Sequence, residues 1–240
     1  MKNRNKAIIV ASLVGAVNSY ATCSVPSNGA TAGSTVTCTG TTTGVYSINA
    51  ANVTFLNQGD MVGSGTQFGI IISQPTTTSG INATNQGTMT WNNALPNGLG
   101  LRSTVMLGYY TNNNLTSATF TNDTAGQIFV NGTVNLPNGY ATGGISVGAR
   151  YGTAILDNKG SVTSTSTSTN GLGYAEGIAA AGKNAQITNS GSVIVTANQG
   201  SSATGIEING SWTTGTTYIN NSGTVTVSAL GADTQAVVIN

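Results

Sequence analysis

Charged residues are scarce in this chain of 240 residues, where Asp, Glu, Lys and Arg make up 5% of the sequence and histidine is absent. Without histidine the chain can form neither a Ser-His-Asp triad nor a Cys-His dyad. A zinc site would need histidine or clustered cysteines, and the chain has two cysteines in all. These absences exclude the common triad hydrolases and zinc enzymes.

Long hydrophobic runs are also few, since the mean hydropathy is +0.06. That value is too low for a bundle of membrane helices, while 5% charge is unlike an ordinary cytosolic enzyme. Disorder is disfavoured because Val, Ile, Leu, Tyr and Thr recur throughout and the net charge is only +1. Gly, Ser, Thr and Asn crowd the sequence instead.

The N-terminus has the pattern of an export signal. Three basic residues precede an apolar run over residues 7–17, and Ser19-Tyr20-Ala21 places small residues where a signal peptidase reads them. We expect residues 1–21 to be a signal peptide cleaved after Ala21, with the chain exported through the inner membrane to the cell surface or beyond. The alternative is a buried N-terminal strand or helix. Lipidation of Cys23 fits less well, because Thr22 is larger than the residue that normally precedes a lipidated cysteine.

Cleavage would leave four basic and six acidic residues, a net charge of −2. Such a balance offers no basic surface for nucleic acid or for anionic lipid. We therefore expect neither as a partner.

Both cysteines, Cys23 and Cys38, follow the expected cleavage site closely. In an exported protein this pairing suggests a disulfide bond, which would close an N-terminal cap over residues 22–50. Two free buried thiols are the alternative.

An Asn-x-Gly phrase recurs along the rest of the chain. Its glycines are 28 to 39 residues apart, about 33 on average, which indicates repeat architecture. A degenerate copy ends at Gly126. The asparagines that begin the phrase are Asn57, Asn85, Asn158, Asn189 and Asn221.

Each glycine of the phrase is followed two positions later by an apolar residue, and four of the six copies have another apolar residue four positions later. This alternation is typical of a half-buried strand, whereas a helix would avoid so much Thr, Gly and Asn. The apolar residues two positions on are Met61, Met89, Ile128, Val162, Val193 and Val225.

A further apolar cluster closes each unit, from residues 68–72 to residues 237–239. The pattern therefore predicts three short strands per unit, with each unit forming one circuit of a β-solenoid over residues 51–240. We expect an all-β rod of about six circuits of roughly 33 residues. Asparagines at equivalent turns would stack into an amide ladder, and both Asn and Gly tolerate left-handed backbone angles at such turns.

These residues resemble the secreted passengers of Gram-negative autotransporters of the type V pathway. The resemblance rests on Thr22-Cys23 to Cys38-Thr39-Gly40 after a signal peptide, and on the Asn-Ser-Gly-Thr-Val units. Similar phrases occur in filamentous haemagglutinin-like adhesins. The resemblance implies a right-handed parallel β-helix, a structural or adhesive stalk, and a β-barrel translocator that would lie downstream of this N-terminal fragment.

The partner implied for such a stalk is a glycan or protein on a host, bacterial or matrix surface, with self-association of the rods as an alternative. An insertion between Gly87 and Gly126 suggests where a ligand binds, because it predicts a protruding loop within residues 107–120. The candidate binding residues are Tyr109, Tyr110, Asn112, Asn113 and Asn114.

An enzyme acting on polysaccharide is the alternative function, since a β-helix can carry lyase or glycosidase activity. Glu176 and Glu207 are 31 residues apart and occupy nearly equivalent places, so they would lie about 5 Å apart on neighbouring circuits. Arg102 and Arg150 are candidates for sugar contact. One acid per circuit is also what a solvated face would show, so we expect no catalytic residue, cofactor or metal.

Overall fold

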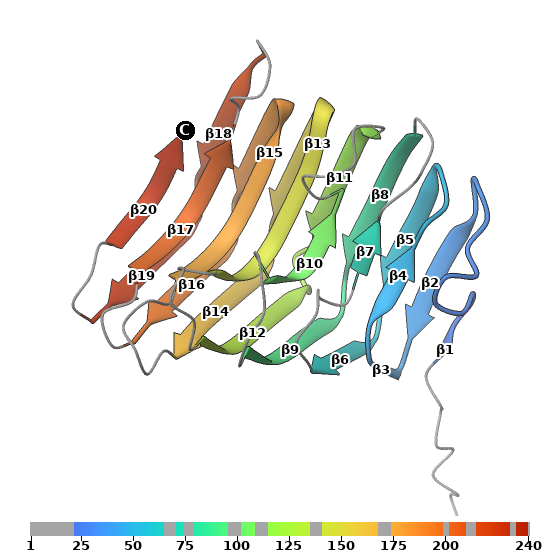
Figure 1. The fold of residues 1–240 in the computed structure, drawn as a ribbon, viewed down its shortest axis with the longest axis horizontal. Coiled ribbons are helices and arrows are strands. Elements are labelled where there is room, and N and C mark those ends of the chain that lie inside the picture. The colour runs from blue at the N-terminus through green and yellow to red at the C-terminus, as the bar shows by residue number, and fades with distance from the viewer. Residues whose placement is uncertain are drawn as a thin grey trace, which may run out of the picture.

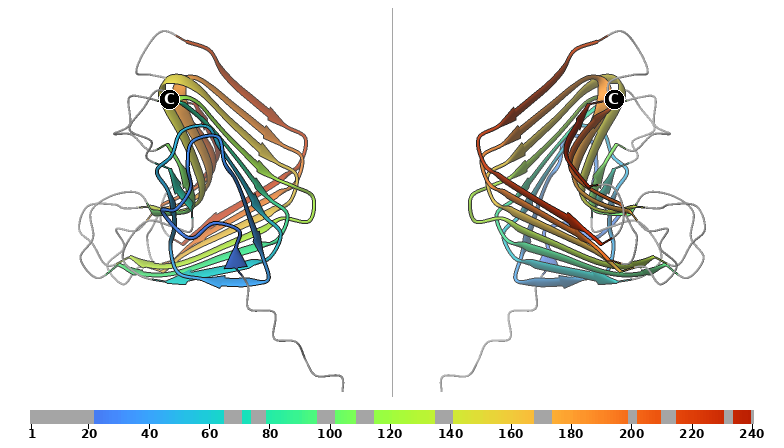
Figure 2. Two further views of the ribbon diagram at one scale, coloured as in Figure 1. Left: turned by 90° about the vertical axis from the view of Figure 1, so that its right-hand side faces the viewer. Right: turned by 90° about the vertical axis from the view of Figure 1, so that its left-hand side faces the viewer.

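The computed structural model describes residues 22–64, 71–73, 79–95, 102–108, 115–134, 141–167, 174–198, 202–209, 215–230 and 234–239. Within these ranges the chain forms an all-β parallel solenoid (Figure 1). The colour in Figure 1 runs along the coil from one end to the other, so successive turns stack in sequence order. In the end-on views of Figure 2 the strands of successive turns lie behind one another.

Two sheets contain all the described strands. The larger sheet has thirteen strands: β1 (Thr22–Cys23), β2 (Thr35–Thr39), β4 (Tyr46–Ile48), β5 (Val53–Asn57), β7 (Ile71–Ser73), β8 (Ser79–Asn85), β10 (Arg102–Leu107), β11 (Leu115–Asn122), β13 (Ala141–Asn158), β15 (Tyr174–Asn189), β17 (Ser202–Asn209), β18 (Thr217–Asn221) and β20 (Thr234–Ile239). The smaller sheet has seven: β3 (Thr41–Thr43), β6 (Asp60–Ser64), β9 (Thr88–Leu95), β12 (Gln127–Val134), β14 (Ser161–Thr167), β16 (Ser192–Ala197) and β19 (Thr224–Ala229).

The turns differ in length along the coil. Each of the four turns between Asn85 and Asn221 has 31 to 37 residues between ladder asparagines, and the turn before them has 28. The first stacked pair, Cys38 with Asn57, is 19 residues apart. The structure thus supports about four turns of about 32 residues, with shorter turns at the N-terminal end, in place of six equal circuits.

The prediction of three separate strands per unit does not hold at every turn. In the 18-residue β13 and the 16-residue β15, the third strand of one turn and the first strand of the next are continuous, whereas β17 and β18 are again separate strands. The pairing of β13 with β15 shifts register between Ala149 and Thr153, which marks the corner. Because backbone pairing runs through this corner, the expected first and third faces belong to one bent sheet.

The core lies between the two sheets and is built from columns of stacked side chains. The column of Met61, Met89, Ile128, Val162 and Val193 is at most 1% exposed, which confirms the strand faces expected from the repeat. Such stacking removes apolar surface from water at every turn.

Column members also match in size. Gly63 stacks on Trp91, and a side chain at Gly63 would occupy the space of the indole ring. Trp91 is 1% exposed although it is the largest core residue. Gly63 departs from the apolar pattern of the repeat because the Trp91 side chain of the next turn fills the space beside it, and protein interiors are close-packed.

In the described part of the chain, no helix has the length and hydropathy needed to cross a membrane. The expected signal peptide, residues 1–21, lies outside the described residues.

Candidate functional site

A ladder of asparagine side chains runs through the turn between the two sheets. Each side-chain Nδ2 donates to the Oδ1 of the asparagine one turn later, over 2.7 to 2.9 Å. The ladder comprises Asn57, Asn85, Asn122, Asn158, Asn189 and Asn221, of which the first five are fully buried. The predicted ladder is therefore present, and its burial makes it a structural feature of the rod.

Asn122 is the ladder residue that the repeat pattern missed. It precedes Gly126 by four residues instead of two, so the Asn-x-Gly phrase is broken there. The signal that would have found it is the alternation before it, because Phe120 occupies the column position of Phe55 and Ala83. Spacing from the preceding strand, and not from the following glycine, places the ladder residue.

The glycines of the phrase allow the backbones of successive turns to approach closely, and they do not adopt left-handed backbone angles. Among described residues, the positive φ angles occur elsewhere, at positions such as Asn28, Asn52 and Gly108. A side chain at Gly191 would collide with the carbonyl oxygen of Gly160, which accepts a hydrogen bond from the Ser192 amide at 2.9 Å. The expectation of left-handed angles at these turns is wrong, because the crowding between turns already demands glycine.

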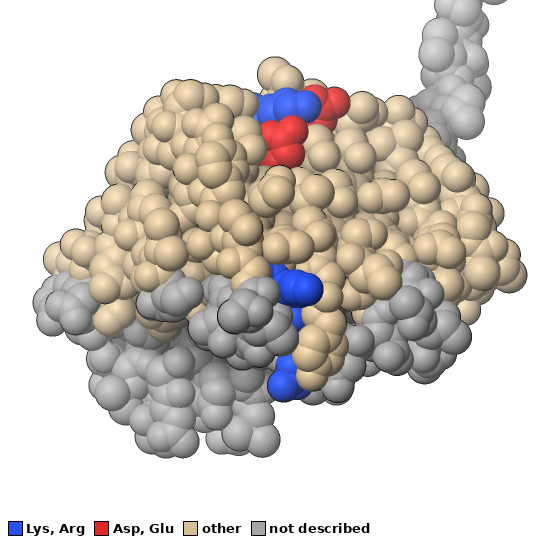
Figure 3. Space-filling view, turned by 90° about the horizontal axis from the view of Figure 1, so that it is seen from above, with Lys and Arg blue, Asp and Glu red and all other residues tan. Residues whose placement is uncertain are grey.

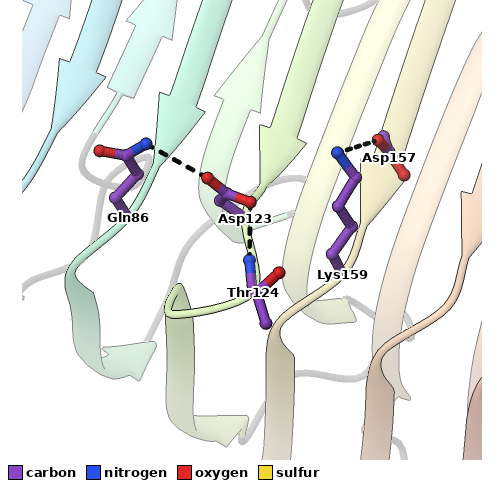
Figure 4. Close-up of polar contacts among 5 residues, drawn as sticks. All are labelled: Gln86, Asp123, Thr124, Asp157 and Lys159. Atoms are coloured by element: carbon purple, nitrogen blue, oxygen red, sulfur yellow. Dashed lines mark hydrogen bonds and ion pairs between the residues drawn. The ribbon is translucent and has the colours of Figure 1, made fainter.

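A second, exposed ladder runs one residue after the asparagines (Figure 4). Gln58 Nε2 donates to Gln86 Oε1, and Gln86 Nε2 donates to Asp123 Oδ2, each over 3.2 Å. The amide of Thr124 donates to Asp123 Oδ1, and this bond, followed by that from Gln86, lowers the pKa of the Asp123 carboxyl. Lys159 continues the column and pairs at 3.2 Å with Asp157.

The N-terminal end of the coil is covered by the segment that carries the cysteines. Cys23 and Cys38 form the predicted disulfide, with Cα atoms 3.9 Å apart, and β1 pairs antiparallel to β2 at the sheet edge. The Tyr46 hydroxyl donates to the Val25 carbonyl, and the Asn28 amide donates to Ser47 at 2.9 Å. This segment thus occupies the edge that would otherwise offer unpaired backbone groups.

The candidate binding residues Tyr109, Tyr110, Asn112, Asn113 and Asn114 lie outside the described residues. The two ends of the loop are described, at Gly108 and Leu115, and both are buried.

The two arginines proposed for sugar contact lie in different strands, Arg102 in β10 and Arg150 in β13. Arg102 begins β10, and its side chain lies outside the described part. The Arg150 guanidinium lies over the Tyr151 ring, 5.4 Å from its centroid.

Glu176 and Glu207 do not occupy equivalent places, contrary to the sequence expectation. The register pairs Glu176 with Thr204 and Glu207 with Ala179, so the two acids are three positions apart on neighbouring strands. The offset arises because the path from β16 to β17 is three residues shorter than the path from β14 to β15, since Ser166 pairs with Ala197 and Tyr174 pairs with Ser202.

The two carboxyls are nevertheless close enough to interact. Burial, and then the charge of Glu207, raise the pKa of Glu176 to about 8. Glu207 accepts from the Tyr174 hydroxyl at 3.1 Å and from Asn209 Nδ2 at 2.8 Å. Burial is also the main cause that raises the pKa of Tyr174, whose hydroxyl interacts with Thr204. We call Tyr174, Glu176, Thr204, Glu207 and Asn209 the acidic cluster.

Chemically, the described residues present a coil with few charged side chains and one buried acidic cluster. Comparison with protein-family models, with curated proteins and with solved structures gives no match. A parallel β-solenoid with a buried asparagine ladder is therefore the classification that the chain itself supports.

Proposed function

We propose that this protein is an exported structural and adhesive rod of the autotransporter passenger type, with a right-handed coil. The observation that carries the proposal is the asparagine ladder, in which five side-chain hydrogen bonds join six asparagines of successive turns. Such a ladder keeps successive turns in register, because slippage would leave buried amides without partners. The product is a stiff support for whatever it displays.

The outer surface favours recognition over chemistry. On the face drawn in Figure 3, the charged side chains of described residues gather in two small groups, and the remaining described surface carries no charge. Ser, Thr, Asn and Gln on the outside offer neutral hydrogen-bonding groups. An uncharged surface of this kind suits a glycan or a neutral protein surface better than nucleic acid.

The candidate binding loop is proposed as the contact region because of where its ends lie. Gly108 stacks against Gly148, at the corner that later turns cross within the continuous strand β13. The chain between Gly108 and Ser117 is four residues longer than the equivalent stretch of β13 between Gly148 and Thr153. Its tyrosines and asparagines supply the residue types that are common in binding loops.

A binding assay with loop variants tests this proposal. The purified chain would be applied to fixed epithelial cells and to wells coated with fibronectin, laminin or collagen. We expect binding to at least one of these surfaces, and a loss of tenfold or more when Tyr109 and Tyr110 are both replaced by serine. The matched control is Tyr218→Ser, since Tyr218 is 53% exposed on the rod itself. Equal binding by both variants would remove the loop from the proposal, and absence of binding to every surface would remove adhesion.

The acidic cluster keeps a polysaccharide-acting enzyme as the second candidate. Two carboxyls with different environments are what general acid and base chemistry needs. Glu176 is 2% exposed, however, so a substrate could reach it only after rearrangement. Release of reducing ends or unsaturated products from a panel of plant and bacterial polysaccharides, lost in Glu207→Gln, would favour the enzyme over the rod.

A further inference from the structure

The bend in the larger sheet brings together side chains that face away from the core. In β15, Ala175 and Ile178 are buried in the core, and a side chain at Gly177 would meet Val193 and Val195. Glu176 and Ala179 therefore face the opposite side. Two consecutive core-facing residues, Gly177 and Ile178, make the strand concave on its outer side at this point.

The next turn repeats this arrangement in β17. Ala203 and Ile206 are buried in the core, and a side chain at Gly205 would meet core valines. Thr204 and Glu207 consequently face outward on the two sides of the same bend. The register places Thr204 beside Glu176.

An earlier pair of turns shows how close such positions come. Ser103 occupies the column of Glu176, and Ser146 occupies the column of Glu207, again one turn apart. The Ser103 and Ser146 hydroxyl oxygens lie 2.6 Å apart. Since the backbone positions are equivalent, the carboxyls of Glu176 and Glu207 converge across the bend in the same way.

One oxygen in this cluster has no hydrogen-bond partner. Glu176 is 2% exposed, and its Oε1 is buried without a donor among the described residues. Around it lie the Glu207 carboxylate, held by the Tyr174 hydroxyl at 3.1 Å, and the Thr204 side chain that interacts with Tyr174. A buried carboxyl oxygen without a donor is costly, and either a proton or a bound cation would offset that cost.

We propose that the acidic cluster binds a divalent cation of the calcium type. All of the candidate ligands are oxygens, from two carboxyl groups and two hydroxyls, and calcium accepts six to eight oxygens in flexible geometry. Binding would release the proton that burial favours on Glu176. The described residues contain no group of three or more acidic, histidine or cysteine side chains placed to share a metal ion. Hydroxyls, backbone carbonyls and water would therefore complete the coordination, and the low ligand charge predicts a weak site with a Kd of about 10⁻⁴ to 10⁻³ M.

Calcium binding would join β15 to β17, because its two carboxylate ligands come from successive turns. The ion would link these two turns along the rod axis at the bend in the larger sheet. The asparagine ladder links the same turns at a different corner of the coil. Magnesium should bind less well, since it requires strict octahedral geometry and gives up its water reluctantly.

The test is calorimetric titration of the purified chain with calcium chloride after treatment with a chelator, together with thermal unfolding. We expect a Kd near 10⁻³ M or below and a rise in Tm of about 3 °C at 10 mM calcium. Glu176→Gln and Glu207→Gln should abolish both responses. Asp157→Asn is the matched control, because Asp157 is paired with Lys159 on the exposed ladder and should leave the calcium response intact.

Terbium luminescence gives a second readout that does not depend on the stability of the glutamate variants. Terbium bound beside Tyr174 should be excited through that ring, so Tyr174→Phe should remove most of the sensitised emission while Tyr218→Phe leaves it unchanged. Absence of calcium binding by the unmodified chain would overturn the proposal. An unchanged response in Glu207→Gln would also overturn it, because the ion would then lie elsewhere.

Discussion

Asn158 and Lys159 are neighbours in the chain but belong to ladders with opposite environments. Asn158 is fully buried and bonds to asparagines of the turns before and after it. Lys159 is exposed, and its column contains Gln58, Gln86 and Asp123 in earlier turns. The inner column thus keeps one residue type at all six of its described positions, while the outer column changes residue type along its length.

The difference shows where stacking constrains the sequence. A buried amide must find both a donor and an acceptor in the adjacent turns, and asparagine is short enough to provide them at the spacing between strands. An exposed side chain can form hydrogen bonds with water instead, so the residue type at each position of the outer ladder has little effect on the free energy of unfolding. Burial, and not proximity alone, therefore makes the repeat visible in the sequence.

The strongest way to test this comparison is to place the same charge on either side of one strand. Val193 is fully buried, whereas Ile194 is 40% exposed. Val193→Asp should prevent stable folding, because an unpaired charge in the core costs several kcal/mol. Ile194→Asp should change the free energy of unfolding by less than about 1 kcal/mol. Urea denaturation followed by circular dichroism measures both, and equal effects would mean that the strand faces are reversed.

The buried acid Glu176 and the exposed acid Asp123 should affect the pH dependence of stability in opposite ways. The folded-state pKa of Glu176 is raised from 4.5 to about 8, mainly by burial and then by Glu207. Between these values the unfolded state loses a proton that the folded state keeps, so stability should fall as pH rises, by up to about 1.4 kcal/mol per pH unit. Thermal unfolding in chelator from pH 6 to 8 should show this slope, and Glu176→Gln should remove it. The lowered pKa of Asp123 acts only as pH falls below its usual range.

An effect smaller than that of Val193→Asp is expected from interrupting the inner ladder. Asn158→Ala would leave the Nδ2 of Asn122 and the Oδ1 of Asn189 buried without their partners, for about 2–4 kcal/mol of destabilisation. Lys159→Ala should cost less than about 0.5 kcal/mol, because its pair with Asp157 is exposed. Equilibrium unfolding of both variants would show whether the inner ladder outweighs the outer one, and a large effect of Lys159→Ala would contradict the comparison.

The most local effect should follow removal of the disulfide. The disulfide joins two cysteines that are 15 residues apart in the sequence. Replacing Cys23 and Cys38 by serine removes this crosslink, which contributes about 3 kcal/mol to the free energy of unfolding in the chain-entropy model. Hydrogen exchange should rise in β1 and β2, while strands after Gly126 keep their protection, because each turn contacts mainly its neighbours. Uniformly faster exchange along the coil would show that the rod unfolds as one cooperative unit whose stability depends on its N-terminal end.

Several features of the fold could be predicted from particular residues. The Asn-x-Gly phrase predicted five of the six ladder asparagines, and the apolar residue after each glycine predicted the core column from Met61 to Val225. Cys23 and Cys38 were the only cysteines, so their bond needed no spatial information. Asn122 was missed because a two-residue insertion separates it from Gly126, although Phe120 before it keeps the column.

The acidic cluster could not be located from sequence spacing. Glu176 and Glu207 are 31 residues apart, close to one turn, and that spacing alone predicts equal positions. The register offsets them by three, and it is the bend at Gly177 and Gly205 that brings their side chains toward one another. A bend within paired strands depends on how core side chains pack across the sheets, which no repeat length encodes.

The sequence by itself determined that this protein is a stack of β-strands with a buried asparagine ladder and a disulfide near its N-terminus. It could do so because each of these features depends on one residue type recurring at one column, or on a unique pair. The tertiary structure alone decided that two sheets, rather than three, enclose the core, and that Glu176 is buried against Glu207. Those outcomes depend on packing between columns, where the free energy of each residue is set by neighbours that lie far away in the sequence.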